Sequence, residues 1–395
     1  MQYRKMGKLG YKVSALGFGM MRLPVLNGEW GKINLIEAKK MVRYAIDNGV
    51  NYVDTAWPYH ETESENITGE ILKDGYREKV KLTTKLPIYL VKKAEDFDYY
   101  LNLQLKRLQT DYFDFYLLHG INKVKWQRLK DINILERAEN AKKAGKINHI
   151  GFSFHGSYNG FKEIIDDYDW DLVLIQYNYA DENIQATRKG LEYAADKGIA
   201  VAIMEPLKGG KLAESKGDNQ KIINKAINKR SIVDWSLHYI WNHPGVSVVL
   251  SGMSTFEQVK KNIDSANKSG INLMTKEDLE IINNLKDLYN SKLKVQCTNC
   301  KYCMPCPHEV DIPENFNIYN DIIWNGEIND WNRYWYGEFS KPNKEGTWIG
   351  YGPADLCIKC GECLEKCPQG INIPERLSEI VNIFKGKASL SEFLH

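Results

Sequence analysis

Four polar residues lie at or just beyond the ends of short apolar runs that we predict to be strands. Asp54 lies in "NYVDT", Lys85 ends "VKLTTK", His119 ends "YFDFYLLH", and Tyr59 follows Asp54 in "VDTAWPYH". A phenol has a pKa of about 10, and a neighbouring ammonium favours its ionised form. An aspartate keeps that ammonium charged, and an imidazole can orient a carbonyl oxygen by hydrogen bonding. We interpret the set as a carbonyl-reducing site in which Tyr59 is the acid, Lys85 lowers its pKa, Asp54 anchors Lys85 and His119 orients the substrate.

A second candidate site consists of eight cysteines, all of which lie after residue 296. They form two motifs: Cys297, Cys300, Cys303 and Cys306 before Pro307, and Cys357, Cys360, Cys363 and Cys367 before Pro368. The second motif has the spacing C-x2-C-x2-C-x3-C-P, which is typical of bacterial iron–sulfur proteins. Zinc is the alternative, but its sites usually come as two separated C-x2-C pairs. Crowded thiols in a chain without an export signal favour metal over disulfides, so we expect [4Fe–4S] clusters.

The elements that must position the first site alternate between strand and helix. Candidate strands cover residues 13–19, 51–55, 80–85, 112–119, 148–153, 172–178, 199–205 and 246–252. Helical segments between them include residues 34–48, 92–109, 130–144, 184–197 and 226–242. Eight alternations over about 250 residues indicate a closed parallel (β/α)8 TIM barrel, in which chemistry lies at the carboxyl ends of the strands. A doubly wound open sheet is the competing fold, but no GxGxxG motif follows the first strand.

The segments "DTAWPY", "TK" and "LLH" resemble those that carry the Asp–Tyr–Lys–His tetrad of the aldo-keto reductases. The resemblance covers about residues 1–265. It implies a barrel domain over residues 1–290, with an N-terminal hairpin, that interconverts a carbonyl compound and an alcohol with NAD(P). It also implies cofactor contacts from Asp54 and from Gly19, Met20, Arg22, Ser153, Gln176, Met204, Glu205, Leu207, Gly210, Ser251, Gly252, Gln258 and Asn262.

The resemblance also bears on the choice between NADP and NAD. The lysine and arginine that often bind a 2′-phosphate in this family fall on Gly252 and Gln258. Without a guanidinium fork at these positions, strict NADP preference loses its main physical basis. We therefore expect NAD or dual use.

The two cysteine motifs, roughly fifty residues apart, resemble the helical ferredoxin module of respiratory reductase subunits. This resemblance implies a small, mainly helical iron–sulfur domain over residues 291–395 with two [4Fe–4S] clusters. It further implies swapped ligation, with one cluster on Cys297, Cys300, Cys303 and Cys367 and the other on Cys357, Cys360, Cys363 and Cys306. A single cluster on the second motif is the alternative.

Composition limits the partners of the chain. It carries 53 Lys and Arg against 51 Asp and Glu, so no strong field favours nucleic acid or an anionic membrane. No apolar run approaches the roughly 20 residues of a membrane helix, and we expect a cytoplasmic protein. The expected substrate is a small carbonyl compound or alcohol, with Trp57 and Trp126 as apolar walls of its pocket.

The expected hydride carrier and clusters differ in how many electrons they move. A hydride carries two electrons and a cubane one, and the sequence holds no flavin-binding segment to convert between them. The clusters therefore have a structural role, sense redox state, or exchange electrons with a redox partner protein. The alternative function is an iron–sulfur electron-transfer component whose barrel serves mainly as scaffold or partner-binding module.

Overall fold

The computed structural model describes residues 1–213, 217–297, 303–337, 352–367 and 369–394. The chain divides into two compact units, residues 1–285 and 286–395. Among the described residues, no helix is long and apolar enough to cross a membrane.

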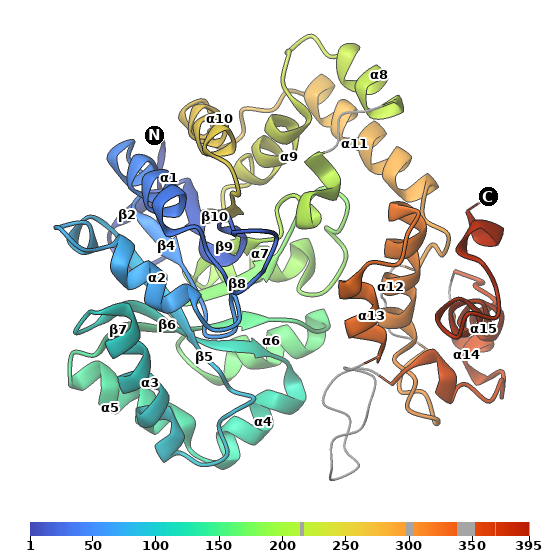
Figure 1. Ribbon diagram of the computed structural model, residues 1–395, viewed down its shortest axis with the longest axis horizontal. Coiled ribbons are helices and arrows are strands. Elements are labelled where there is room, and N and C mark those ends of the chain that lie inside the picture. The colour runs from blue at the N-terminus through green and yellow to red at the C-terminus, as the bar shows by residue number, and fades with distance from the viewer. Residues whose placement is uncertain (214–216, 298–302, 338–351, 368, 395) are drawn as a thin grey trace. The chain divides into compact units, whose positions relative to one another are not determined.

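Eight parallel strands of the first unit close into a barrel in the order β10-β3-β4-β5-β6-β7-β8-β9 (Figure 1). The strands are β3 (Leu16–Gly19), β4 (Tyr52–Asp54), β5 (Lys81–Leu86), β6 (Phe113–Ile121), β7 (Ile147–Phe154), β8 (Leu172–Gln176), β9 (Ala200–Met204) and β10 (Val248–Gly252). The predicted closed barrel is thus confirmed, and each of the eight predicted runs contains or overlaps one of these strands.

One predicted strand, residues 13–19, is divided in the structure. Its first part belongs to β2 (Lys12–Ser14), which pairs antiparallel with β1 (Tyr3–Lys5), and its second part is β3. Met6 and Val13 of this N-terminal hairpin are fully buried in the inner core of the barrel. The main-chain nitrogen of Lys8 donates to the oxygen of Gly198, just before β9 begins. The hairpin therefore closes the amino-terminal end of the barrel and leaves the carboxyl ends of the strands for chemistry.

Helices surround the barrel, as Figure 1 shows. They are α1 (Leu35–Asp47), α2 (Ser64–Ile71), α3 (Glu95–Leu108), α4 (Lys123–Asp131), α5 (Ile134–Lys143), α6 (Tyr158–Asp167), α7 (Thr187–Asp196), α9 (Ile232–Trp241) and α10 (Phe256–Asn267). Two further helices are α8 (Asp218–Asn224), between α7 and α9 in the chain, and α11 (Lys276–Ser291), which begins in the first unit and ends in the second. Short 3-10 helices are η1 (Met20–Arg22), η2 (Arg77–Lys79) and η3 (Lys208–Ala213). Side chains alternate along the strands, so that Phe115 and Leu117 of β6 fill the inner core while Tyr116 and Leu118 pack under the helices.

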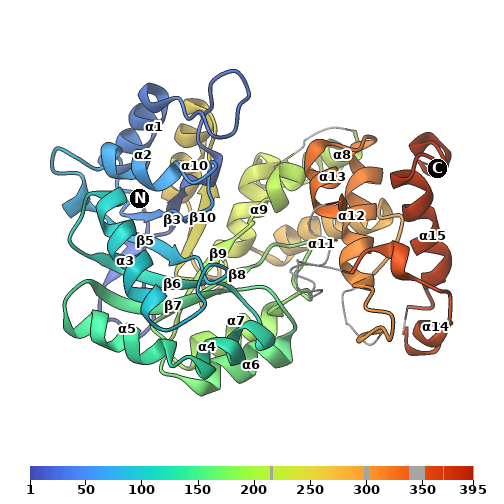
Figure 2. The same ribbon diagram turned by 60° about the horizontal axis from the view of Figure 1, so that its bottom comes forward.

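The second unit is mainly helical (Figure 2). It contains α12 (Ile312–Asn325), α13 (Asp330–Gly337), η4 (Ala354–Leu356), α14 (Glu362–Lys366), α15 (Ile373–Phe384) and η5 (Leu390–Phe393). Both α12 and α15 begin with a proline in the first turn, where its missing N–H costs no helical hydrogen bond. Phe316, Tyr319, Leu377 and Ile380 from these two helices lie in one buried apolar cluster.

Candidate active site and cysteine cluster

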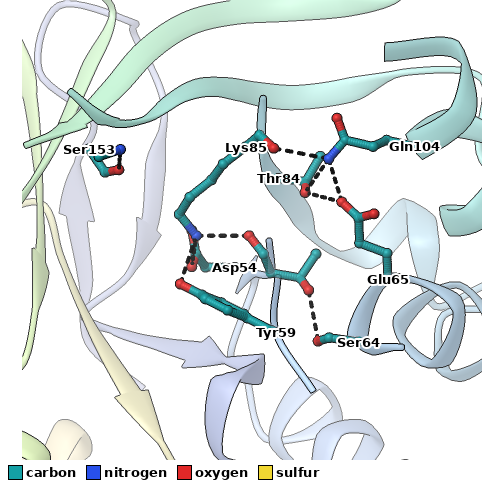
Figure 3. A network of polar contacts seen from close by, with 10 residues as sticks. Asp54, Tyr59, Ser64, Glu65, Thr84, Lys85, Gln104 and Ser153 are labelled. Carbon is teal, nitrogen blue, oxygen red and sulfur yellow. Dashed lines mark hydrogen bonds and ion pairs between the residues drawn. The ribbon is translucent and has the colours of Figure 1, made fainter. Parts of the chain in front are cut away.

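Asp54, Lys85 and Tyr59 converge at the carboxyl ends of β4 and β5 (Figure 3). The Nζ atom of Lys85 lies 2.6 Å from Oδ1 of Asp54, 2.8 Å from the main-chain oxygen of Thr55 and 3.3 Å from Oη of Tyr59. An ammonium has three N–H donors, and these three acceptors use all of them. Lys85 and Asp54 are 1% and 2% exposed. The lysine is therefore held in one position by a buried ion pair and two further hydrogen bonds.

Burial and mutual attraction oppose each other in this group. Burial raises the pKa values of Asp54 and Tyr59, and the charge of Lys85 lowers both without cancelling the effect of burial. Burial lowers the pKa of Lys85, but Asp54 and Tyr59 raise it more, so its pKa lies above the usual value. Burial thus keeps the pKa of Tyr59 above that of a free phenol, although Lys85 lowers it as expected. Tyr59 is protonated and Lys85 charged at neutral pH, which is the state that an acid catalyst requires.

His119 of β6 lies beside the tyrosine, with ring centroids 6.3 Å apart and the rings edge to face. Burial, followed by the charge of Lys85, lowers its pKa well below the usual value, so the imidazole is neutral. Its Nδ1 atom is buried and has no hydrogen-bond partner among the described residues. A neutral imidazole can serve as a hydrogen-bond donor to a carbonyl oxygen without adding a charge.

The predicted cofactor-binding residues share one location, the carboxyl ends of the barrel strands and the segments that follow. Gly19 ends β3, Gln176 ends β8, Met204 ends β9 and Gly252 ends β10. The remaining ones lie in the same strand ends, in η1, in the segment of β9 to η3, or in α10: Met20, Arg22, Asp54, Ser153, Glu205, Leu207, Gly210, Ser251, Gln258 and Asn262.

Several of these residues contact one another or the tetrad strands. The main-chain N–H of Gly120, next to His119, donates to Oγ of Ser153 at 2.7 Å. Nδ2 of Asn262 donates to Oγ of Ser251 at 3.0 Å. Arg22 packs directly on Gly252, since a Cβ atom there would lie 2.7 Å from Cγ of Arg22. The missing side chain at 252 thus gives room to a different cation.

Two predicted cofactor contacts are also engaged in local structure. Oε1 of Gln258 accepts from the main-chain nitrogens of Ser254 and Thr255 at 2.8 and 3.3 Å, as part of a capping box at the start of α10. Nε2 of Gln176 donates to Oδ2 of Asp181 at 2.7 Å. Asp181 is 2% exposed and also accepts from Nζ of Lys208 at 2.5 Å. No sequence signal pointed to Asp181, which lies in a polar loop after β8.

The segment that carries Trp126, one of the predicted pocket walls, is helical, because α4 spans Lys123–Asp131. Trp126 is 1% exposed and its Nε1 donates to Asp167, so it belongs to the core and the expectation of a pocket wall there is wrong. Trp57 lies under the guanidinium of Arg107, whose Cζ is 4.4 Å from the ring centroid. Trp57 lies two residues before Tyr59 in the same loop, so it stays a candidate wall of the substrate pocket.

Cysteines of both motifs line one open pocket in the second unit. Its lining includes Cys303 and Cys306 of the first motif and Cys357, Cys360 and Cys363 of the second. Burial raises the pKa of the Cys363 thiol, and so do Cys357, Cys360 and Cys306, which are close enough to interact with it. The described residues contain no group of three that could hold a single metal ion. Thiols around an open space fit a cluster with a ligand at each corner.

The structure describes only part of the ligand set expected for the other cluster. Cys300 lies outside the described residues. Cys303 is buried, and Cys297 and Cys367 are partly buried against the apolar core of the second unit. None of the seven described cysteines forms a disulfide bond.

Comparison with known proteins identifies both units. The model of the aldo/keto reductase family matches residues 15–286, well over half of the 395-residue chain. The chain belongs to the aldo/keto reductase family. The model of a 4Fe-4S dicluster domain matches residues 296–372. This aldo/keto reductase therefore combines the family's barrel with a C-terminal iron–sulfur domain, as the two resemblances predicted.

Curated relatives match the barrel region. The Bacillus subtilis protein YqkF, an uncharacterized oxidoreductase, is 26% identical over 326 residues, 74% of this chain and 99% of the relative. L-Galactose dehydrogenase of Arabidopsis thaliana is 28% identical over 291 residues, 66% of this chain and 87% of the relative.

Solved structures show the same fold. An aldo-keto reductase from Bacillus halodurans in its holo form is 25% identical, with a TM-score of 0.60. An aldo-keto reductase from Klebsiella pneumoniae in complex with NADPH is 22% identical, with a TM-score of 0.59. In both cases the match covers 72% of this chain and 96% of the other.

Proposed function

We propose that this aldo/keto reductase interconverts a small carbonyl compound and an alcohol by hydride transfer. The observation that carries the proposal is the buried contact of Lys85 with Asp54 at 2.6 Å and with Tyr59 at 3.3 Å, beside a neutral His119. In the direction of reduction, Oη of Tyr59 gives its proton to the carbonyl oxygen as negative charge develops there. Lys85 stabilises the resulting phenolate, and Asp54 holds Lys85 in place. His119 orients the carbonyl by a hydrogen bond.

A nicotinamide dinucleotide would supply the hydride. The chain's own groups fit such a ligand, since Oγ of Ser153 lies at the main chain beside His119 and the Nδ1 atom of His119 is buried without a partner among the described residues. Ser153 and Gln176 would hold the carboxamide, and the ends of β3, β9 and β10 would bind the ribose and phosphates. We propose dual use with preference for NAD, because neither Gly252 nor Gln258 offers a cation. The ratio of kcat/KM with NADH and NADPH in one assay tests this preference.

For the second unit we propose two [4Fe–4S] clusters with swapped ligands. The pocket brings Cys306 together with Cys357, Cys360 and Cys363, which supports this pairing for one of them, and Cys303, assigned to the other cluster, lies in the same lining. A bound cluster would supply one-electron chemistry or a structural link between the motifs. Since hydride transfer moves two electrons and no flavin site is evident in the sequence, we propose that the clusters do not reduce the substrate.

Replacing Tyr59 by Phe tests the proposed chemistry. The variant keeps the ring but loses the proton, so kcat for reduction of aldehydes and ketones should fall by roughly 10²- to 10⁴-fold. The measurement is nicotinamide oxidation with a panel of carbonyl compounds. Tyr99→Phe is the matched control, because Tyr99 is 62% exposed and its replacement should leave kcat unchanged. Turnover that survives in Tyr59→Phe would remove the assignment of Tyr59 as the acid, whereas no turnover in the wild type would favour the alternative, in which the barrel is a scaffold for an electron-transfer protein.

A further inference from the structure

A buried carboxylate that the proposed chemistry does not use lies close behind Lys85. Glu65 is the second residue of α2 and has no exposed surface. Its Oε1 atom accepts from Oγ1 of Thr84 at 2.7 Å and from Nε2 of Gln104 at 2.5 Å (Figure 3). Burying a carboxylate costs free energy unless it is hydrogen-bonded and paired with a cation. We therefore expect Glu65 to have a specific role at this position.

Gln104 of α3 connects this carboxylate to the backbone of Lys85. Its Nε2 atom donates to Oε1 of Glu65 and also, at 3.0 Å, to the main-chain oxygen of Lys85. Its Oε1 accepts from Oη of Tyr116 at 2.6 Å. Nε2 also lies 3.4 Å from Oγ1 of Thr84. With acceptors around its nitrogen and a donor at its oxygen, the amide has a fixed orientation.

The main-chain oxygen of Lys85 needs a side-chain donor because of its position at the edge of β5. Asp54, the last residue of β4, pairs with Thr83 of β5. Lys85 lies two residues further, so its carbonyl points to the same edge of β5, where β4 has ended. Gln104 takes the place of the missing strand neighbour. Without it, the carbonyl of Lys85 would be left buried and unpaired.

The residue next to Glu65 supports the other end of the same lysine. Oγ of Ser64 lies 2.9 Å from Oγ1 of Thr55, and the main-chain oxygen of Thr55 accepts from Nζ of Lys85. Two consecutive residues at the start of α2 therefore contact both the strand end that carries Lys85 and the loop that receives its ammonium.

Glu65 also contributes one of two negative charges that balance the two cations near the site. Nε of Arg107 lies 3.2 Å from Oε2 of Glu65, an ion pair that is not aligned as a hydrogen bond. Burial raises the pKa of Glu65, while Thr84, Gln104 and the charges of Arg107 and Lys85 lower it. Asp54 and Glu65 thus face Lys85 and Arg107, two charges of each sign.

We propose that Glu65 is a positioning residue of the active site, which acts through Gln104 and Thr84 to hold Lys85 against Asp54 and Tyr59. The inference rests on the proposed function of the tetrad. Glu65 itself contacts no reacting atom. Displacement of a catalytic group by about 1 Å can cost 10²-fold in rate, so its loss should reduce kcat and leave binding at the mouth of the barrel unchanged.

The test uses Glu65→Gln in the full-length protein. We expect kcat to fall about tenfold to a hundredfold while KM for the nicotinamide cofactor changes less than about twofold. Removing a negative charge near Lys85 disfavours its charged form and favours the phenolate of Tyr59. The alkaline limb of the pH profile of kcat should therefore move to lower pH, which a merely structural defect would not cause.

Two further variants make the result decisive. Glu63→Gln is the matched control, because Glu63 is exposed on the preceding turn and should leave kcat and the pH profile unchanged. Gln104→Met breaks the connection but keeps the charge, so kcat should fall without the pH shift. If Glu65→Gln does not fold, Gln104→Met is judged by kcat against KM: a lower kcat with an unchanged KM for the nicotinamide cofactor supports the proposal, and a normal kcat overturns it. Normal kcat in the folded variants, with Tyr59→Phe still impaired, would overturn the role of Glu65 alone; an active Tyr59→Phe would overturn the proposed function.

Discussion

At the scale of single residues, the site depends on a balance between burial and one ammonium. Burial raises the pKa values of both Asp54 and Tyr59, and Lys85 is the cation that opposes this effect. A lysine at this position therefore has two effects: it orients the phenol through a 3.3 Å hydrogen bond and it stabilises the phenolate left after proton transfer. The phenol serves as an acid at neutral pH because its proton stays bound until the transition state.

This balance predicts the pH dependence of reduction. Reduction needs protonated Tyr59, whose pKa is raised by burial from its usual value of 10.0. The rate should therefore be level through neutral pH and fall only above about pH 10, as the proton is lost. Lys85→Met removes the charge that lowers this pKa, so the alkaline limb should move to still higher pH while kcat falls by roughly 10²- to 10⁴-fold.

Lys81→Met, at the other end of the same strand, is the control for this experiment. Lys81 pairs with Asp114, which keeps a second partner in Arg77. We expect an unchanged pH profile for it. An alkaline limb in Lys85→Met at or below that of the wild type would contradict the role assigned to Lys85.

At the scale of elements, the packing of α2 on α3 holds the site together. A Cβ atom at Gly69 of α2 would lie 2.8 Å from the main-chain oxygen of Arg107 in α3, so only glycine allows this approach. Glu65 and Gln104 are among the residues that these helices bring into contact. The separation of α2 and α3 is therefore coupled to the position of Lys85.

Gly69→Ala should force the two helices apart. We expect a loss of about 1–3 kcal/mol in the free energy of unfolding, measured by denaturant titration, together with reduced kcat. Gly160→Ala is matched to it, since Gly160 also lies in a helix but its Cβ would meet atoms no nearer than 3.5 Å. The free energy of unfolding of that variant should rise by about 0.4–1 kcal/mol, because alanine lowers the conformational entropy of the unfolded chain. Equal effects of the two substitutions would argue against a close contact at Gly69.

The elements also show what could be predicted from sequence. Each of the eight strands coincides with or overlaps a predicted apolar run, because buried parallel strands have a continuous apolar pattern. The helix α4 was not predicted, since its segment "KVKWQRLKD" is mostly charged and buries only Trp126 and Leu129. The tetrad residues lie at strand ends that sequence can locate. Glu65 and Gln104 are 39 residues apart, and only the packing of two helices reveals their contact.

At the scale of the whole molecule, one chain combines an aldo/keto reductase barrel with a 4Fe-4S dicluster domain, and we propose that each supplies its own kind of redox chemistry. The barrel suits a two-electron hydride transfer, and the dicluster domain suits one-electron steps. Proposed swapped ligation joins cysteines that are about fifty residues apart, so each cluster would connect the two motifs of the second unit. Metal binding should therefore contribute to the folding of this unit.

Cluster content tests this arrangement. Protein purified without oxygen should contain about eight iron atoms and eight sulfides per chain, as expected for two cubanes. Cys306→Ser should lower iron to about four, because Cys306 is the proposed fourth ligand beside Cys357, Cys360 and Cys363. Ile358→Ser, in the second motif but 65% exposed, should retain all the iron. Zinc in place of iron, or full iron content in Cys306→Ser, would contradict the proposed ligation.

The most direct test of the whole account follows the hydrogen itself. Purified protein is given a carbonyl substrate with NADH or NADPH that carries deuterium at C4 of the nicotinamide, and the product alcohol is analysed by mass spectrometry. Hydride transfer in the barrel predicts one deuterium on the carbinol carbon, formed by the wild type and nearly lost with Tyr59→Phe. An alcohol that carries hydrogen from water at this carbon would show that the electrons arrive by another route, and would contradict the proposal.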